Sequence, residues 1–179
     1  MRAMMPGMQP PLPSTVTLER RTRAHAEALF AVLAEPRLYQ YLDEAPPESV
    51  EALRQKLARS ESGRSPDGSE QWLNCVVRDA SQQVLGNVQA TIFPSGETNV
   101  AYVFGSAHWG RGLAFEAMRQ MLGILATEFG VNNFLIVAER ANTRSVRLAQ
   151  RLGFSAATAE LAARKALTPT ELLLRRGPA

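Results

Sequence analysis

Two glycines at the start of a long predicted helix constrain this chain more than any other feature. Residues 109–114 read Trp-Gly-Arg-Gly-Leu-Ala and separate a strand-like run from an apolar, helix-like run at 113–129. The first turn of a helix has N–H groups without intrahelical partners, and the helix dipole places partial positive charge there. Without Cβ atoms at Gly110 and Gly112 the turn can close around an anion, and Arg111 adds a full charge. These residues therefore predict a phosphate cradle, the alternative being a tight turn with one solvated arginine.

The composition is typical of one globular domain without an export signal. The 179 residues are 45% hydrophobic and 21% charged, which suffices for a buried core. No apolar run approaches the roughly 20 residues that cross a bilayer, so we expect no membrane association. Residues 1–13 contain Met, Pro and Gly without a continuous apolar segment, which predicts a mobile tail followed by one domain over 14–179. The single cysteine, Cys75, excludes a disulfide framework and favours the cytoplasm.

The charge pattern argues against a nucleic-acid surface. The net charge is only +3, and the basic residues are almost all arginines scattered along the chain. Nucleic-acid-binding domains more often carry a stripe of basic residues with interleaved aromatic residues. The same mild positive excess suits an anionic cofactor, and composition does not separate the two.

Hydrophobic periodicity predicts an antiparallel meander followed by a crossover unit. Strands are expected at 16–20, 72–78, 84–93, 98–104 and 134–138. Helices are expected at 24–34, 49–59, 113–129 and 142–152. Near the C-terminus a last strand is expected at 172–174, with a short helix or an irregular connection at 160–167. The strand–helix–strand order around the glycine turn implies a right-handed crossover between two parallel neighbours.

A second motif opens the helix at 142–152. Asn142 or Thr143 is the expected cap of this helix, because both residue types favour that position, and Gly153 is the expected stop. Taken alone, Ser145 is a solvated or packed helix residue. The order of the elements makes the motif more specific. Antiparallel strands, the glycine turn, an apolar helix and a buried strand come first, and Asn-x-x-Ser and the Leu-Gly-Phe of 152–154 follow.

With these motifs in this order, the sequence resembles the GNAT superfamily of acyl-CoA-dependent N-acetyltransferases, and most of all its Rim-type branch of ribosomal-protein N-terminal acetyltransferases. The resemblance covers about residues 16–154 and is most specific at 109–117, at Asn142 and Ser145, and at 152–154. It implies an α+β fold with a central twisted mixed sheet of about seven strands. That sheet is splayed between its fourth and fifth strands and flanked by about four helices.

The resemblance also implies acetyl-CoA as the cosubstrate and no metal. In this family the pantetheine arm fills the gap between the splayed strands and the pyrophosphate meets the glycine turn. The cofactor-binding residues it implies are Tyr102, Val103, Phe104, Gly110, Arg111, Gly112, Leu113, Ala114 and Asn142.

The same comparison implies how the leaving thiolate is protonated. Many family members use a tyrosine in the helix after Asn142, but Ala149 occupies that position here. Ser145 matches the serine of the Rim-type branch and is the expected proton donor. The base that takes the proton of the attacking amine is left open between Glu97, Glu139 and water.

The expected function is transfer of an acetyl group from acetyl-CoA to a primary amine by direct attack on the thioester. The acceptor is a protein N-terminus or a small-molecule amine, and the protein is expected to be a monomer or a homodimer. Ala149 keeps an alternative open, namely a catalytically weak acyl-CoA-binding or sensory module.

Overall fold

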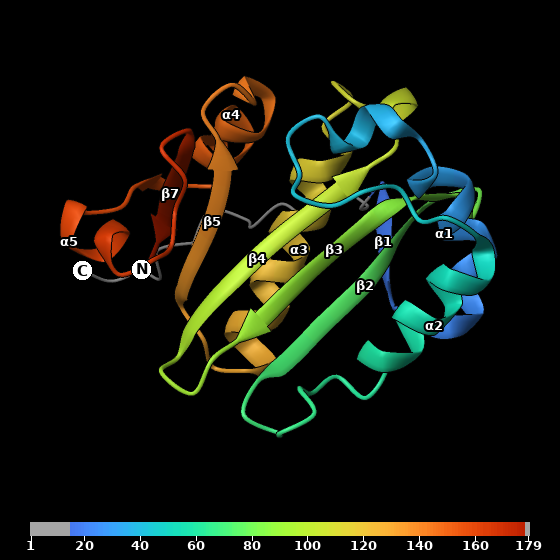
Figure 1. The fold of residues 1–179 in the computed structure, drawn as a ribbon, viewed down its shortest axis with the longest axis horizontal. Coiled ribbons are helices and arrows are strands. Elements are labelled where there is room, and N and C mark those ends of the chain that lie inside the picture. Colours follow the sequence, from blue (N-terminus) through green and yellow to red (C-terminus); the bar gives the residue numbers. More distant parts are fainter. Residues whose placement is uncertain (1–14, 178–179) are drawn as a thin grey trace, which may run out of the picture.

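A seven-stranded mixed sheet organises residues 15–177, the part of the chain that this computed structural model describes (Figure 1). The tail expected at 1–13 lies outside the described residues. The strand order is β1-β2-β3-β4-β5-β7-β6, and only the β4–β5 pair is parallel among these described strands. The strands are β1 (Val16–Arg20), β2 (Gln71–Asp79), β3 (Val84–Ile92), β4 (Glu97–Phe104), β5 (Asn133–Glu139), β6 (Ser155–Ala156) and β7 (Glu171–Arg176).

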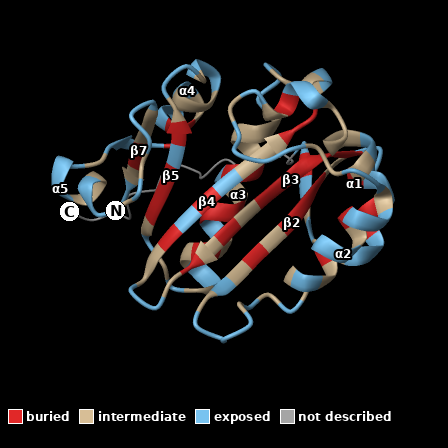
Figure 2. Ribbon diagram, in the orientation of Figure 1, coloured by how far each residue is buried: buried red, intermediate tan, exposed pale blue. Residues whose placement is uncertain are grey.

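Helices cover both faces of the sheet (Figure 1). Helices α1 and α2 bury leucines against β2 and β3 on one face, and α3 packs on the other. The α-helices are α1 (Ala26–Leu33), α2 (Val50–Ser60), α3 (Leu113–Glu128), α4 (Thr143–Arg151) and α5 (Ala159–Ala163). Short 3-10 turns are η1 (Arg23–His25), η2 (Pro36–Tyr39) and η3 (Ser106–His108). Figure 2 shows the buried residues concentrated along the strands, which places the core between the sheet and its helices.

The predicted α+β architecture is confirmed, including the parallel crossover through α3. The apolar stripe of α3 is buried, so its methionines are core residues. Two local features differ from the sequence expectation, since the first helix begins as the 3-10 turn η1 and the short strand β6 was not expected. Of the two alternatives for the connection before β7, the structure has the short helix, α5.

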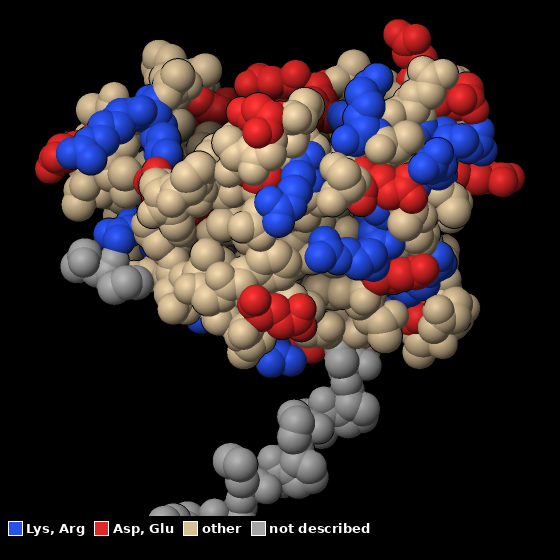
Figure 3. Space-filling model, turned by 90° about the horizontal axis from the view of Figure 1, so that it is seen from below, with Lys and Arg blue, Asp and Glu red and all other residues tan. Residues whose placement is uncertain are grey.

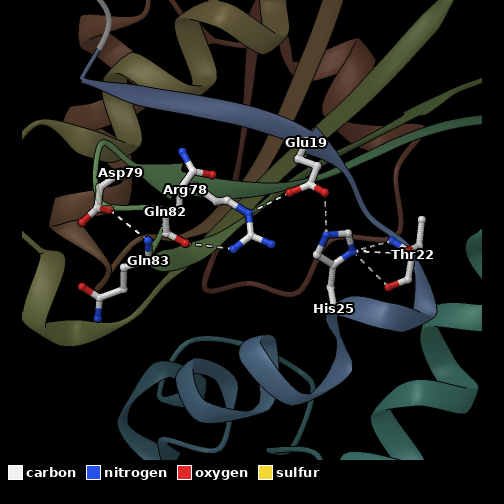
Figure 4. A network of polar contacts seen from close by, with 7 residues as sticks. All are labelled: Glu19, Thr22, His25, Arg78, Asp79, Gln82 and Gln83. Carbon is white, nitrogen blue, oxygen red and sulfur yellow. Dashed lines mark hydrogen bonds and ion pairs between the residues drawn. The ribbon is translucent and has the colours of Figure 1, made fainter.

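A polar network at the edge of the sheet ties β1 to β2 and to η1 (Figure 4). The Glu19 carboxylate accepts a hydrogen bond from Arg78 Nε at 2.7 Å and lies 3.1 Å from His25 Nε2. His25 is buried, and its Nδ1 accepts the backbone N–H of Thr22 at 3.0 Å. This bond assigns the ring proton to Nε2, which therefore donates to Glu19. The buried imidazole thus has a partner at both nitrogens.

We expect Glu19→Gln to destabilise the protein at neutral pH but not in acid. The hydrogen bond from Arg78 is the largest cause that lowers the pKa of Glu19. Because the folded pKa lies below the unfolded value of about 4.3, the carboxylate stabilises the fold above that pH and loses its contribution as the pH falls through the folded pKa. For this half-exposed side chain we expect about 1 kcal/mol at pH 7.

Calorimetric melting temperatures of the wild type and of Glu19→Gln, measured at neutral and acid pH, check this. The difference in melting temperature between the two proteins should disappear below the folded pKa of Glu19. Glu51→Gln is the matched control, because within the described residues the exposed Glu51 carboxylate pairs with Arg54 and Gln55 of its own helix. Equal melting temperatures of wild type and Glu19→Gln at pH 7 would contradict the network's role.

Candidate functional site

The ladder between β4 and β5 exists only at its beginning. Residues 97–99 of β4 pair with residues 133–135 of β5, and no further pair follows among the described residues. Beyond this point β4 continues to pair with β3, and β5 with β7, so the two facing edges diverge (Figure 1). Unpaired edges present backbone N–H and C=O groups to whatever enters the gap. The splay expected between the fourth and fifth strands is therefore confirmed.

A cavity of about 580 Å³ lies in this gap. Both diverging strands line it, together with residues 37, 38 and 40–43, the glycine turn and one side of α4. Nine of the ten site residues expected from the sequence contribute to the lining, namely Tyr102, Val103, Phe104, Gly110, Gly112, Leu113, Ala114, Asn142 and Ser145. The tenth, Arg111, is exposed and does not appear among the described residues that line the cavity.

The glycine turn has the backbone conformation that its sequence predicts. Gly110 and Gly112 have φ values of +74° and +76°, in the left-handed region that side chains disfavour. Gly112 is the N-cap of α3, and within the described residues a Cβ at either glycine would meet no atom beyond its chain neighbours within 4 Å. Because residues 110 and 112–114 line the cavity, the first turn of α3 lies beside open space of the kind that anion binding requires.

Trp109 connects the end of β4, the glycine turn and α4. Its indole Nε1 donates to the Phe104 carbonyl at 2.8 Å. The guanidinium of Arg144 lies 4.2 Å from the ring centroid, and that of Arg37 lies 5.5 Å from it. Both distances fall within the range of cation–π attraction. The ring consequently fixes where the turn begins and holds two positive charges beside it.

Three arginines of α4 face the same cavity. Arg144, Arg147 and Arg151 lie three and four residues apart, which places them on one side of the helix, and all three line the cavity. Arg151 lies 4.7 Å over the ring of Phe115 in the first turn of α3. None of the three forms an ion pair within residues 15–177. This row of arginines was not predicted as part of the site, although its helical spacing is visible in the sequence.

Ser145 contacts a side chain that the sequence analysis assigned only a backbone role. Its Oγ lies 2.8 Å from Tyr102 Oη, which also donates to the Ser145 carbonyl at 3.2 Å. Asn142 accepts the Ser145 N–H at 3.2 Å and so caps α4. Burial raises the pKa of Tyr102, while the hydrogen bond with Ser145 opposes the shift. Ala149 is completely buried. The hydroxyls of Tyr102 and Ser145, by contrast, meet in the cavity.

The carboxylates proposed as bases occupy different places. Glu97 lies in the paired part of β4, where its carboxylate binds Lys165 at 3.1 Å, and it does not line the cavity within the described chain. Glu139 does line it, as does Glu171, its neighbour on β7, which the sequence analysis missed. His108 also lines the cavity, and its Nδ1 is buried without a hydrogen-bond partner in residues 15–177.

Other chemistries receive little support from the described residues. Within 15–177 no group of three or more His, Cys, Asp or Glu is placed to hold a metal ion, and no helix is long and apolar enough to span a membrane. Cys75 is buried, and burial raises the pKa of its thiol to about 11, which makes it a poor nucleophile. On the face shown in Figure 3, Lys and Arg are interspersed with Asp and Glu rather than gathered in a stripe.

Comparison with known proteins agrees with this geometry. The family model described as an acetyltransferase (GNAT) domain matches residues 15–155. The chain therefore belongs to the GNAT acetyltransferase family, whose members use acetyl-CoA. An uncharacterized N-acetyltransferase p20 from Bacillus licheniformis is 23% identical over 141 residues, which is 78% of either chain.

Two solved structures share the fold at low sequence identity. Spermidine N-acetyltransferase from Vibrio cholerae, solved with CoA and spermine, is 19% identical with a TM-score of 0.71, and the match covers 91% of this chain and 94% of that one. RimL, described as a ribosomal L7/L12 α-N-protein acetyltransferase, is 17% identical with a TM-score of 0.71, covering 94% and 92%.

Gly86 on β3 lets β4 approach closely where the gap opens. A Cβ at this position would lie 2.1 Å from the Val103 carbonyl oxygen, which is backbone and cannot swing aside. We expect Gly86→Ala to displace the end of β4 and to lower the free energy of unfolding by about 3 kcal/mol. Denaturant titration measures the loss. Gly123→Ala on α3 is the control, since a Cβ there meets nothing within 4 Å; equal stabilities of the two variants would contradict the close approach.

Proposed function

We propose that this protein transfers an acetyl group from acetyl-CoA to a primary amine, and that it belongs to the Rim-type branch of its family. The observation that carries the proposal is one continuous cavity that joins the gap between β4 and β5 to the N-terminus of α3. A long thioester with a diphosphate at one end has the shape that such a cavity accepts. The serine at position 145, combined with Ala149, supports the Rim-type assignment.

The residues around the cavity fit acetyl-CoA. The N–H groups of 110–114 would hold the pyrophosphate, because the glycines leave open space before them. The arginine row of α4 supplies charge to the phosphates, since its guanidiniums line the same cavity. Residues 102–104 and Asn142 would lie beside the pantetheine arm. The thioester supplies an activated acetyl group, so no metal is needed.

The chemistry then requires three contributions from the chain. A backbone N–H on the free edge of β4, near Phe104, polarises the thioester carbonyl and stabilises the oxyanion. The Ser145 hydroxyl donates a proton to the leaving sulfur. Glu139, which lines the cavity, or a water molecule takes the proton of the attacking amine. The acceptor enters beside the segment 37–43 and is a protein N-terminus or a small-molecule amine.

An amine panel incubated with acetyl-CoA, with free thiol measured as the product, tests this function. The panel contains peptides with free N-termini, amino acids, polyamines and aminoglycosides. We expect thiol release that depends on one class of amine. Because Ala149 stands where many family members have a tyrosine, the alternative of a weak acyl-CoA-binding or sensory module stays open, and tight CoA binding without thiol release for every amine would establish that module instead.

Gly112→Leu should weaken CoA binding about tenfold or more, a loss of about 1.4 kcal/mol or more. The reason is that the leucine side chain would occupy the space in front of the α3 amides. Isothermal titration calorimetry measures the CoA affinity of each variant. Gly130→Leu is the matched control, because Gly130 has a similar φ of +68° and similarly open space but does not line the cavity within the described chain. Equal CoA affinities of the two variants would contradict a phosphate cradle at Gly112.

Ser145→Ala should lower kcat about tenfold to a hundredfold while leaving the KM for acetyl-CoA nearly unchanged. The reason is that a proton donor acts in the transition state and adds little to binding. Steady-state kinetics with the best amine of the panel measures both constants. Thr143→Ala removes an exposed hydroxyl from the same helix and should retain wild-type kcat; an unchanged kcat in Ser145→Ala would remove the donor role.

A further inference from the structure

Tyr102 is the residue whose side chain joins the two sides of the splayed gap at Ser145. It belongs to β4, whereas Ser145 lies in the first turn of α4, 43 residues later. Its phenol oxygen lies 2.8 Å from Ser145 Oγ and 3.2 Å from the Ser145 carbonyl oxygen. Both residues line the cavity.

We propose that Tyr102 and Ser145 form a two-hydroxyl relay, in which Tyr102 is a positioning residue that orients the Ser145 proton and replaces it as it leaves. This inference rests on the proposed acetyl transfer and adds a second residue to its proton-donating step. The Ser145 Oγ is the atom that meets the sulfur, and Tyr102 acts through it.

The two oxygen–oxygen contacts allow two arrangements of the hydroxyl protons. When Tyr102 donates to the Ser145 carbonyl, the serine proton points to the phenol oxygen. When Tyr102 donates to Ser145 Oγ, the serine proton is released and can point into the cavity. Rotation of two O–H bonds interconverts the arrangements without moving a heavy atom. The second arrangement prepares Ser145 to donate.

A phenol makes the serine a better donor than it is alone. An alkoxide left on Ser145 would be strongly basic, whereas a phenol has an ordinary pKa of about 10. Transfer from Tyr102 to Ser145 as the serine proton departs moves the negative charge onto the aromatic ring. Burial, which raises the pKa of Tyr102, keeps the phenol protonated at neutral pH and ready to donate.

The step balances in protons and electrons. The amine nitrogen forms a bond to the carbonyl carbon with its lone pair, and the carbon–sulfur bond breaks with its electron pair staying on sulfur. The Ser145 hydroxyl proton moves to sulfur, and the Tyr102 proton moves to Ser145 Oγ. The phenolate regains a proton from the water that carries away the proton lost by the amine nitrogen. One proton leaves nitrogen and one reaches sulfur, so no further reactant is required.

Tyr102→Phe, Ser145→Ala and the double variant test the relay. We expect Tyr102→Phe to lower kcat about tenfold with the KM for acetyl-CoA within about twofold of wild type, since the ring remains in place. The double variant should be no slower than Ser145→Ala, because the two hydroxyls act as one unit. Losses that multiply in the double variant would overturn the relay.

Two further measurements separate the relay from a structural role. The wild-type kcat should fall at high pH as the phenol ionises, and this fall should be absent in Tyr102→Phe; an unchanged high-pH profile would overturn the relay. Ser145→Thr retains the hydroxyl and should keep most of the activity that Ser145→Ala loses. Thr127→Val, which removes an exposed hydroxyl bonded to the Gly123 carbonyl near the C-terminal end of α3, should keep the wild-type kcat.

The experiments distinguish a failure of the acetyl transfer from a failure of the relay. A wild-type protein that releases no thiol with any amine of the panel overturns the acetyl transfer, and the relay with it. A wild-type protein that turns over, together with a Tyr102→Phe variant of equal kcat, overturns the relay alone. Circular dichroism and CoA titration of each folded variant ensure that a lost rate is not a lost fold.

Discussion

The interrupted ladder between β4 and β5 is the constraint on which the rest of the site depends. Three residue pairs join the strands, after which each strand keeps only its outer neighbour. Strands in a sheet rotate relative to one another, and here that divergence is kept open because β7 holds β5 along its length while Gly86 lets β4 lie close to β3. The free edges cannot be left in an apolar interior, since unpaired backbone groups are costly to bury. A gap exposed to solvent and able to receive a polar, extended ligand resolves this conflict.

Charge is distributed unevenly around that gap. The net charge of the whole chain is only +3, yet the N-terminus of α3 and the arginine row of α4 line one cavity. Field lines from several positive groups reinforce one another in a cleft bounded by protein. Trp109 and Phe115 hold two of these guanidiniums in place through their rings, so the charge is positioned before any ligand arrives. An anionic cosubstrate is thereby favoured at the gap although the net charge of the whole chain is small.

The site also couples the sheet to the helix that follows β5. Asn142 both caps α4 and lines the cavity, and its cap bond ends on the N–H of Ser145. Ser145 in turn meets Tyr102 of β4. The helix start, the serine and the tyrosine are thus fixed relative to one another by consecutive hydrogen bonds. A displacement of β4 would alter the geometry of Ser145, the proposed proton donor, as well as that of the gap.

The sequence by itself determined the positions of most helices and strands, the glycine turn and a helix cap at residue 142 or 143, because these depend on residues close together in the chain, on hydrophobic period and on backbone freedom. Through the family resemblance it also determined the splay. Only the tertiary structure decided that Tyr102 meets Ser145, that the α4 arginines face the cavity and that Glu97 binds Lys165 outside it. The Tyr102–Ser145 and Glu97–Lys165 contacts join residues that are 43 and 68 positions apart in the sequence. No local sequence pattern specifies a contact over such a separation. They follow from how the crossover through α3 and the return through β7 set two strands and a helix side by side.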